Sequence, residues 1–440
     1  MRRGPAWRRG WRLVSRCSGS ICLAMRCVMP STRAAPVACH KAVFSFHPHS
    51  GFLEEPLMTT SHDVAALRAR EYAWMANDPA IFLNAASVGP MPAAAVEVAH
   101  TWSRMRAQPH LLPFQGMLDA AATARAQFAA LVGADADEIA LMPNTTYGLN
   151  LAARALPLRP GTILTFDGEF PSCVYPFQAL GSRGITLELI PRKHGLPDED
   201  ALVTAIARPD VVAVVVSWVQ FATGFVADLA RIGNACRERG VFFIVDGIQG
   251  CGVRPIDLHA LPIDIFASGA QKWQLSPWGT GFVYVRRELI TAIDPIDVGW
   301  ACMKTSTDYT RLTDYDYDFF DDARRFEVVT LAYQDFAVAN ASTRVLLDIG
   351  VEAVAAHITS LGTRIVEWAQ SRPDVRLVTP ADPARRAGVI SFASESLAAM
   401  AARLTTAQIT HTVREGAVRL SPHCYNTEAE IERVLEILDN

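Results

Sequence analysis

Two polar residues in the middle of the chain follow strand-like segments and could take part in chemistry. Asp246 follows the apolar run 241–245, and Lys272 follows a second such segment, 265–268, and the small residues after it. An acidic residue at the carboxyl end of a buried strand lies where open α/β sheets bind their ligands. Taken alone, Asp246 could equally be a strand-end cap, and Lys272 could be a solvated surface charge.

The sequence around Lys272 is typical of a lysine held in a pocket. Apolar and small residues flank it, and a glycine-containing turn at 276–281 precedes the next strand-like run. Burial lowers the pKa of a lysine and makes the neutral amine a nucleophile toward aldehydes. Pyridoxal phosphate needs such a lysine and a carboxylate at its pyridine nitrogen, and Asp246 could be that carboxylate. The two residues therefore indicate a pyridoxal-phosphate site.

A phosphate group would need hydrogen-bond donors, and a segment further upstream offers them. Thr145 and Thr146 lie between a strand-like and a helix-like segment, directly after Asn144. Hydroxyls and free N–H groups at a helix N-terminus form an anion site, although the same residues could be a plain helix cap. Ser268 and Gln271, which lie next to Lys272, could add further donors to the phosphate.

In combination these motifs resemble those of a known family. They are Thr145-Thr146, Asp246-x-x-Gln249, Ser268-Gly-x-x-Lys272 and the block from Arg419 to Glu428. They resemble the class V aminotransferases, a family of fold-type I pyridoxal-phosphate enzymes that includes cysteine desulfurases, isopenicillin N epimerase-like proteins and kynureninase. The resemblance spans about residues 80–438. It implies pyridoxal 5'-phosphate as cofactor and an α/β fold, with a large domain built on a mainly parallel sheet and a smaller C-terminal α/β domain.

The resemblance also implies roles for the matching residues around the cofactor. Lys272 matches the lysine that forms the Schiff base and moves the proton at the substrate α-carbon. Asp246 matches the partner of the pyridine nitrogen, and Gln249 matches a residue that hydrogen-bonds the ring hydroxyl. The expected phosphate ligands are Thr145, Thr146 and Ser268.

Further positions match residues that complete the site. Thr330 matches a phosphate contact supplied by a second subunit, which implies a homodimer. Phe170 matches an aromatic residue stacked on the cofactor ring, or else a core phenylalanine. Arg419 matches the arginine that binds the substrate α-carboxylate through its planar, two-pronged guanidinium. Arg414 is a second candidate for that task or a surface ion pair, and Asn84 lines the substrate pocket or is a turn residue.

Departures from the relatives bear on the reaction. Cysteine desulfurases carry a reactive cysteine on a mobile loop before the final arginine, whereas here a short connection joins Arg414 to Arg419 and Cys424 lies beyond it. We therefore expect an enzyme acting at the α-carbon of an amino acid, with epimerase or Cβ–S lyase chemistry favoured and transamination left open. A cysteine desulfurase and a non-catalytic pyridoxal-phosphate-binding module are the alternatives. Trp278 and Phe221 suggest a bulky, apolar pocket.

The elements that must position these residues follow a βαβ rhythm from about residue 130. Strand-like runs at 139–142, 162–166, 186–190, 211–217, 241–245, 265–268 and 282–285 are interleaved with helix-like segments. The nearly continuous β-branched run 211–217 is typical of a strand buried on both faces. This alternation predicts a largely parallel sheet with helices on both faces.

The pattern changes after about residue 330, where long helices at 333–349 and 351–370 are expected. Short strands, a hairpin through Glu415-Gly416 and a capping box from Thr427 to Glu430 follow. We therefore predict a large cofactor-binding domain over 58–330, including its N-terminal segment, and a small domain over 331–440.

Composition and charge exclude several classes of protein. The 440 residues are 50% hydrophobic with a net charge of −4, which argues against disorder and against nucleic-acid binding. No apolar run approaches the roughly 20 residues of a membrane helix. The scattered cysteines favour a reducing compartment, so a cytoplasmic location is expected, and no metal site is predicted.

Residues 1–57 stand apart from the rest of the chain. They carry nine Arg or Lys against two acids, and four of the nine cysteines. Upstream sequence translated in error ahead of Met58 is the favoured interpretation. A targeting peptide and a functional basic arm are the alternatives.

Overall fold

The computed structural model describes residues 62–328 and 330–439, so the predictions for residues 1–57 lie outside the described residues. Its centre is a seven-stranded sheet in the order β2-β8-β7-β6-β5-β3-β4. All neighbouring strands from β7 to β4 run parallel, whereas β8 is antiparallel to both β7 and β2. The strands are β2 Ile139–Met142, β3 Gly161–Phe166, β4 Ile185–Ile190, β5 Val211–Ser217, β6 Phe242–Asp246, β7 Ile265–Gly269 and β8 Gly281–Val285.

Helices cover both faces of this sheet, as the βαβ rhythm predicts. Successive strand residues point to opposite faces, so Val215, Ile244 and Ala267 pack on the side of α4 (Thr145–Ala155) and α5 (Tyr175–Gln178). The alternate residues pack with α3 (Phe114–Val132), α6 (Glu199–Ile206), α7 (Leu229–Arg239) and α9 (Tyr333–Ile349). Two layers of apolar side chains therefore enclose the sheet, so the ends of its strands are the places open to functional residues.

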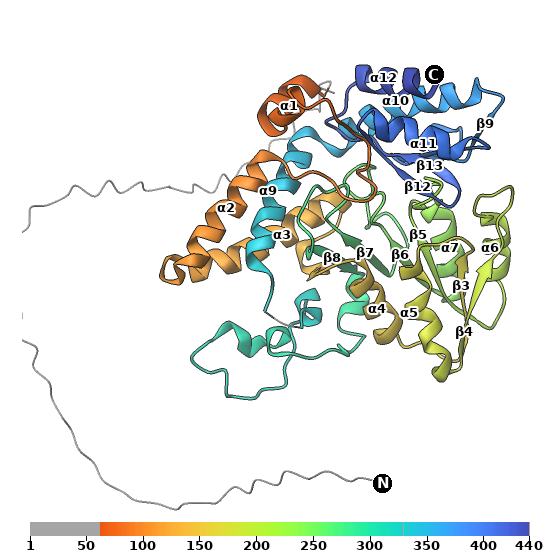
Figure 1. The fold of residues 1–440 in the computed structure, drawn as a ribbon. Helices are drawn as coiled ribbons and strands as arrows, with labels where there is room; N and C mark the ends of the chain where they lie inside the picture. The colour runs from red at the N-terminus through yellow and green to blue at the C-terminus, as the bar shows by residue number, and fades with distance from the viewer. Residues whose placement is uncertain (1–61, 329, 440) are drawn as a thin grey trace, which may run out of the picture. The chain divides into compact units, whose positions relative to one another are not determined.

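A smaller antiparallel sheet in the order β12-β13-β10-β9 lies toward the C-terminus. Its strands are β9 Val375–Leu377, β10 Ile390–Ser394, β12 Thr412–Arg414 and β13 Ala417–Leu420. It packs with α10 (Val351–Gln370), α11 (Leu397–Thr406) and α12 (Glu428–Asp439) around a separate apolar core. Figure 1 shows these helices gathered at the top of the molecule, while α2 (Ala93–Ala107), α3 and α9 lie along one another at the left.

The N-terminal part of the described chain joins this C-terminal part. The short strand β1 (Ile81–Phe82) runs parallel to β11 (Ile409–Thr410), and Asn84 bridges to Ser421. The remaining helices are α1 Val64–Glu71 and α8 Arg287–Ile290. The division into domains at residue 330 stays a prediction, and these pairings show that residues 81–84 contact the C-terminal sheet region.

Local signals explain where elements begin and end. The helix α4 begins at Thr145, because the Asn144 side chain accepts a hydrogen bond from the Tyr147 N–H and caps the helix. The helix α5 spans only four residues and passes into a 3-10 turn at Ala179–Arg183. The capping box expected at Thr427 is present: Glu430 N–H donates to its hydroxyl, and Thr427 N–H donates to the Glu430 carboxylate.

Over residues 62–328 and 330–439, no single helix is long and apolar enough to cross a membrane. The pair α9 and α10 has sufficient length and apolar composition only when taken together, and it bends by 78° at the break between the two helices.

Candidate active site

The carboxyl ends of three adjacent parallel strands bring the central polar residues together. Ser217 at the end of β5 is paired in register with Asp246 at the end of β6, and Asp246 is paired with Ala267 of β7. Lys272 follows three residues after β7 ends. The charges of Asp246 and Lys272 interact, and each affects the pKa of the other. The two residues therefore lie at the same edge of the sheet.

Lys272 is held in surroundings that favour its neutral form. Burial lowers the pKa of its amine to about 8, although the nearby Asp246 carboxylate opposes this shift. Its Nζ lies 5.7 Å from the centre of the Phe170 ring, which is half-exposed and packs edge-on against Phe221. A neutral amine beside a half-exposed aromatic ring can act as a nucleophile or a base.

Asp246 belongs to a buried group that we term the strand-end cluster: Glu169, Cys173, Ser217 and Asp246. The Asp246 Oδ1 accepts from the Ile248 N–H at 3.0 Å, and its Oδ2 lies 3.8 Å from the Cys173 Sγ. The Cys173 Sγ in turn lies 3.7 Å from the Ser217 Oγ. Burial raises the pKa of Asp246, so its carboxylate is short of solvation and suited to a cationic N–H partner.

Sequence reasoning did not assign a role to Glu169, the second acid of the strand-end cluster. Its two carboxylate oxygens accept from the Ser217 N–H at 2.9 Å and the Ser217 Oγ at 2.5 Å. Burial raises the pKa of Glu169 to about 7, and the neighbouring Asp246 charge acts in the same direction. The available signal was its position directly before Phe170. That position marks Glu169 as part of the same turn, but its contact with Ser217 arises only in the folded chain.

The N-terminus of α4 lies against the end of β7. The Thr145 hydroxyl accepts from the Gly269 N–H at 2.8 Å, and the Thr146 and Ser172 hydroxyls lie 2.7 Å apart. A Cβ at Gly148 would meet the Ala267 Cβ at 2.8 Å, so only glycine lets the helix approach this closely. The first N–H groups of a helix lack intrahelical acceptors, which makes this end suitable for an anion.

Ser268 and Gln271, the two other predicted phosphate donors, lie in different surroundings. Ser268 is fully buried and points to the sheet face opposite Ala267, where its hydroxyl accepts from Gln274 at 3.0 Å. The structure therefore does not bring the Ser268 hydroxyl to the α4 side. Gln271 has a buried side-chain oxygen with no partner among the described residues. Its amide remains available to a ligand.

Gln249 is fixed between two elements beside Lys272. Its Nε2 donates to the Ala86 carbonyl at 3.1 Å, and its Oε1 accepts from the Trp273 Nε1 at 2.7 Å. An amide nitrogen carries two hydrogens, so one stays available to a ring hydroxyl. The segment holding Ala86 contacts the lysine loop directly, because the Gly89 N–H donates to the Gln271 carbonyl.

Arg419 is buried without an anionic partner in the described residues. Its guanidinium donates to the Thr412 hydroxyl at 3.1 Å, the Phe221 carbonyl at 2.8 Å and the Ser87 hydroxyl at 2.8 Å. Burial, together with the charge of Arg414, lowers its pKa to about 10. A buried arginine with only neutral partners is poised for a carboxylate.

Two further predicted residues lie near Arg419. Asn84 accepts from the Ser87 N–H through its backbone carbonyl, so it forms the turn that positions Ser87, and its own side-chain oxygen is buried without a partner in the described chain. Arg414 is exposed on the hairpin that also carries Arg419.

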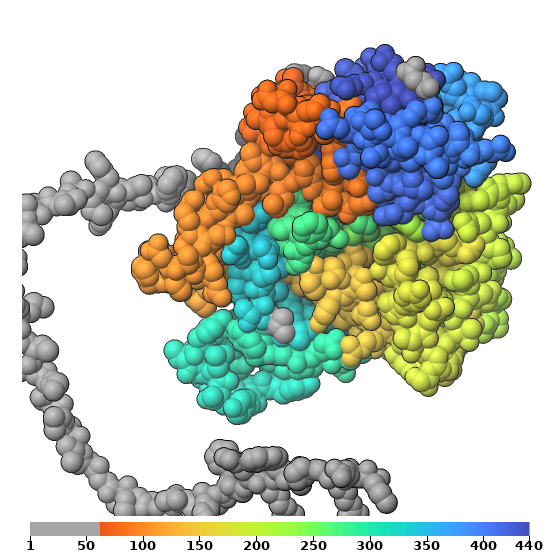
Figure 2. All heavy atoms as spheres, in the orientation of Figure 1, coloured from red at the N-terminus to blue at the C-terminus, as the bar shows by residue number. Residues whose placement is uncertain are grey.

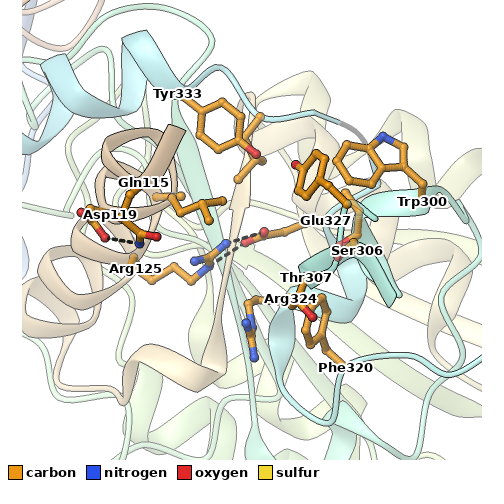
Figure 3. A pocket seen from close by; sticks show the side chains of 16 residues that line it. Gln115, Asp119, Arg125, Trp300, Ser306, Thr307, Phe320, Arg324, Glu327 and Tyr333 are labelled. Carbon is orange, nitrogen blue, oxygen red and sulfur yellow. Dashed lines mark hydrogen bonds and ion pairs between the residues drawn. The ribbon is translucent and has the colours of Figure 1, made fainter. Parts of the chain in front are cut away.

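Thr330 does not join these residues and lies instead at another hollow. It is exposed and lines a cavity of about 470 Å³ with Phe114, Trp300, Tyr309 and Tyr333. A neighbouring cavity of about 290 Å³ shares several of these side chains, and in it Arg125 faces Glu327 (Figure 3). Neither cavity is lined by Lys272 or Asp246.

One group in the described chain has side chains spaced for a metal. Asp135, Glu138 and His259 place ligand atoms within 4.8 Å of one another. Arg287 already forms ion pairs with Asp135 at 2.7 Å and with Asp137 at 2.8 Å. The His259 Nε2 also lies 2.6 Å from a Glu138 carboxylate oxygen, so these side chains have partners within the protein.

Comparisons with known proteins match nearly all of the described chain. The aminotransferase class-V family matches residues 81–434. An uncharacterized aminotransferase of Bacillus subtilis is 28% identical, covering 71% of this chain and 81% of that protein. An isopenicillin N epimerase of Streptomyces clavuligerus is 28% identical over 82% of this chain and 95% of its own length. A probable cysteine desulfurase of Mycobacterium leprae is 30% identical over 62% and 66%.

Solved structures show the same fold. A cystine C–S lyase in complex with cysteine persulfide matches with a TM-score of 0.76 and 25% identity, covering 84% of this chain and 99% of that one. A cysteine desulfurase of Thermococcus onnurineus matches with a TM-score of 0.77 and 23% identity, covering 87% and 98%.

Proposed function

This chain belongs to the class V aminotransferase family, and from that premise we propose that it is a pyridoxal 5'-phosphate-dependent enzyme acting at the α-carbon of an amino acid. The observation that carries the proposal is the pair Lys272 and Asp246. They lie at neighbouring strand ends, with the pKa of the lysine lowered to about 8 and the carboxylate deprived of solvent. An amine nucleophile opposite a buried acid is the donor set that this cofactor requires.

The residues around this pair fit the rest of the cofactor. The α4 N-terminus with Thr145 and Thr146 would hold the phosphate, and the side-chain NH2 group of Gln271 would donate a further hydrogen bond to it. Phe170 presents a half-exposed ring beside Lys272, and Gln249 retains one N–H for the ring hydroxyl. Ser268 has no place in this set, because its hydroxyl is committed to Gln274 on the other face of the sheet.

The protein side chains divide the chemical tasks. When bound, the cofactor supplies an electron-withdrawing ring that stabilises negative charge at the substrate α-carbon. Asp246 would keep the proton on the ring nitrogen, because a buried carboxylate favours a cationic partner. Arg419 would bind the α-carboxylate and orient the substrate. The Lys272 amine would remove and return the α-proton as a general base and acid.

Buried cysteines favour epimerase or Cβ–S lyase chemistry over a cysteine desulfurase. A desulfurase needs an accessible thiolate, and the five cysteines of the described chain are all buried: Cys173, Cys236, Cys251, Cys302 and Cys424. Burial raises the pKa of the Cys424 thiol, the one nearest Arg419 in sequence. Isopenicillin N epimerases, a cystine C–S lyase and cysteine desulfurases all occur among the similar proteins, so the choice rests on the burial of these cysteines.

A homodimer with Thr330 supplied across the interface completes this proposal. Thr330 is exposed, and the cavity it lines is apolar. Large apolar side chains that line this cavity are exposed: Phe114, Leu118, Trp300 and Tyr309. In Figure 2 the segment near residues 300–320, in teal, forms the surface beside α9. A surface this rich in exposed aromatics is typical of a protein interface.

The visible absorption of the purified protein tests the proposal. We expect a band from bound pyridoxal phosphate that is lost in Lys272→Ala and kept in Lys193→Ala, a control at an exposed lysine. A band unchanged in Lys272→Ala would contradict the assignment. Amino acids added to the wild type should then yield racemised product or sulfide, and formation of keto acid alone would contradict the epimerase or lyase choice.

A further inference from the structure

We propose that the substrate carries a second anionic group, and that Arg414 binds this group while Arg419 binds the α-carboxylate. The substrate class would then be amino acids with an acidic side chain. This inference rests on the proposed function, because it assumes that Arg419 faces the substrate α-carboxylate. Arg414 has no role in the reaction at the α-carbon as proposed above.

Strand register places the two arginines on one face of the hairpin. In the antiparallel pair β12–β13, Thr412 is opposite Arg419 and Arg414 is opposite Ala417. Residues two apart on a strand share a face, so these four side chains form one surface, which we term the hairpin face. Diagonal neighbours on such a face have Cα atoms about 7–8 Å apart, within reach of one ligand held by two arginines. Arg419 already reaches Ser87 and Phe221 from this face.

A tight turn fixes the position of Arg414. Glu415 and Gly416 follow it with φ of 46° and 75°, so both residues adopt the left-handed conformation of a two-residue hairpin turn. Positive φ at both central residues is the standard geometry of a two-residue hairpin turn, and such a turn sets the register of the two strands. The backbone of Arg414 is therefore held in register rather than placed at a loose loop tip.

The guanidinium of Arg414 is available to a ligand. Its Nη1 donates to the Val413 carbonyl at 3.1 Å, and no acidic side chain of the described chain forms an ion pair with it. Many other exposed arginines of this chain do have such partners, for example Arg154 with Asp297 and Arg231 with Asp200. The charge of Arg414 is thus left without an anion beside the site.

The balance of charge at the site points to a dianionic ligand. The charge of Arg414 acts on Lys272 and on Arg419, lowering the pKa of both, so it lies within electrostatic reach of each. Asp246 is the acid that offsets Lys272. One α-carboxylate would neutralise Arg419 and leave Arg414 unpaired, whereas a second anionic group between the arginines would relieve their repulsion.

Binding of simple carboxylates tests this inference by calorimetry. On the purified wild-type protein, we expect succinate or glutarate to bind about tenfold more tightly than butyrate, as one added charge-assisted hydrogen-bonded pair provides. Arg414→Gln should abolish this preference while changing butyrate affinity less than twofold. Arg414→Lys, which keeps the charge without the planar fork, should retain part of it. Arg376→Gln, an exposed arginine on β9 of the same sheet, is the matched control and should leave it unchanged.

The outcomes separate this inference from the proposed function. Dicarboxylates carry no amine, so their binding does not depend on the Lys272 amine, and the measurement is repeated on Lys272→Ala. Equal affinities of wild type and Arg414→Gln for succinate and glutarate would overturn the inference even if the visible band behaves as proposed. A visible band that survives in Lys272→Ala would overturn the proposed function, whatever the carboxylates do. In turnover, Arg414→Gln should raise KM for aspartate, glutamate or cysteine sulfinate and not for asparagine or glutamine.

Discussion

The strand-end cluster and the hairpin face handle charge in opposite ways. In the strand-end cluster, Glu169 and Asp246 are buried acids linked through Ser217 and Cys173, at the ends of parallel strands. On the hairpin face, Arg419 and Arg414 are cations with only neutral hydrogen-bond partners, carried by the small antiparallel sheet.

The difference corresponds to two kinds of ligand. Buried acids joined by short contacts within a rigid sheet are preorganised for a group that stays bound. Cations left without counter-ions at the edge of the site suit a group that arrives and leaves, since each binding event supplies the missing charge. The comparison therefore associates the strand-end cluster with the cofactor and the hairpin face with the substrate.

Asp246→Asn provides the strongest test of the strand-end cluster. The change removes the charge that would hold the ring-nitrogen proton, so kcat/KM should fall roughly 10²- to 10³-fold. Because the side chain keeps its shape and the buried charge is relieved, the melting temperature should not fall. Asp297→Asn, at an exposed surface pair, is the control. Activity within threefold of wild type would remove Asp246 from the proposed mechanism.

A pair of glutamate variants tests whether the strand-end cluster is short of positive charge. Glu327 is buried with a cation, since Arg125 donates to both of its oxygens at 2.8 and 2.6 Å. Glu327→Gln should therefore cost about 3–5 kcal/mol of unfolding free energy, because it leaves the buried Arg125 unpaired. Glu169 has no cation partner among the described residues. Its substitution by glutamine should therefore raise the free energy of unfolding above neutral pH.

The sign for Glu169 follows from its raised pKa. The folded state holds this proton up to about pH 7, whereas a free glutamate releases it near 4.5. Wild-type stability should fall between those pH values, by up to about 3 kcal/mol in all. Glu169→Gln removes this slope and should be more stable than wild type at pH 8. Denaturant unfolding of wild type and Glu169→Gln from pH 4 to 8 measures this pH dependence. Parallel plots of unfolding free energy against pH for the two proteins would refute the coupled-acid description.

Arg419→Lys tests the hairpin face. Lysine keeps the charge but loses the fork that contacts Thr412, Ser87 and the Phe221 carbonyl, so kcat/KM should fall by about 10²-fold. Most of the loss should be in KM, because the arginine holds the substrate before the reaction. Steady-state kinetics with the best substrate shows whether the loss lies in KM or in kcat. A loss confined to kcat would argue against carboxylate binding by Arg419.

Gly148→Ala gives the smallest expected effect and probes how α4 reaches the strand ends. The added methyl would meet Ala267 at 2.8 Å, so the helix must shift, at a cost of about 1–3 kcal/mol. Cofactor retention during dialysis should weaken as well. Gly181→Ala, where nothing lies within 4 Å, is the control. Unchanged stability and retention would show that the close approach of α4 to β7 is dispensable.

Sequence alone determined the elements and residues that depend on neighbouring positions. The β-branched run at 211–217, the helices at 333–349 and 351–370 and the hairpin through Glu415-Gly416 all appear where periodicity and turn residues predict them. Asp246 and Lys272 were found in the same way, because both follow directly on recognisable strands.

Only the tertiary structure decided which side chains meet. Strand pairing brought Ser217 beside Asp246 and joined Glu169 to them, and strand alternation turned Ser268 away from Thr145. The pairing of β1 with β11 linked segments more than 300 residues apart. Periodicity reports the environment of each segment but not its partners, since register and packing arise from contacts between distant parts of the chain.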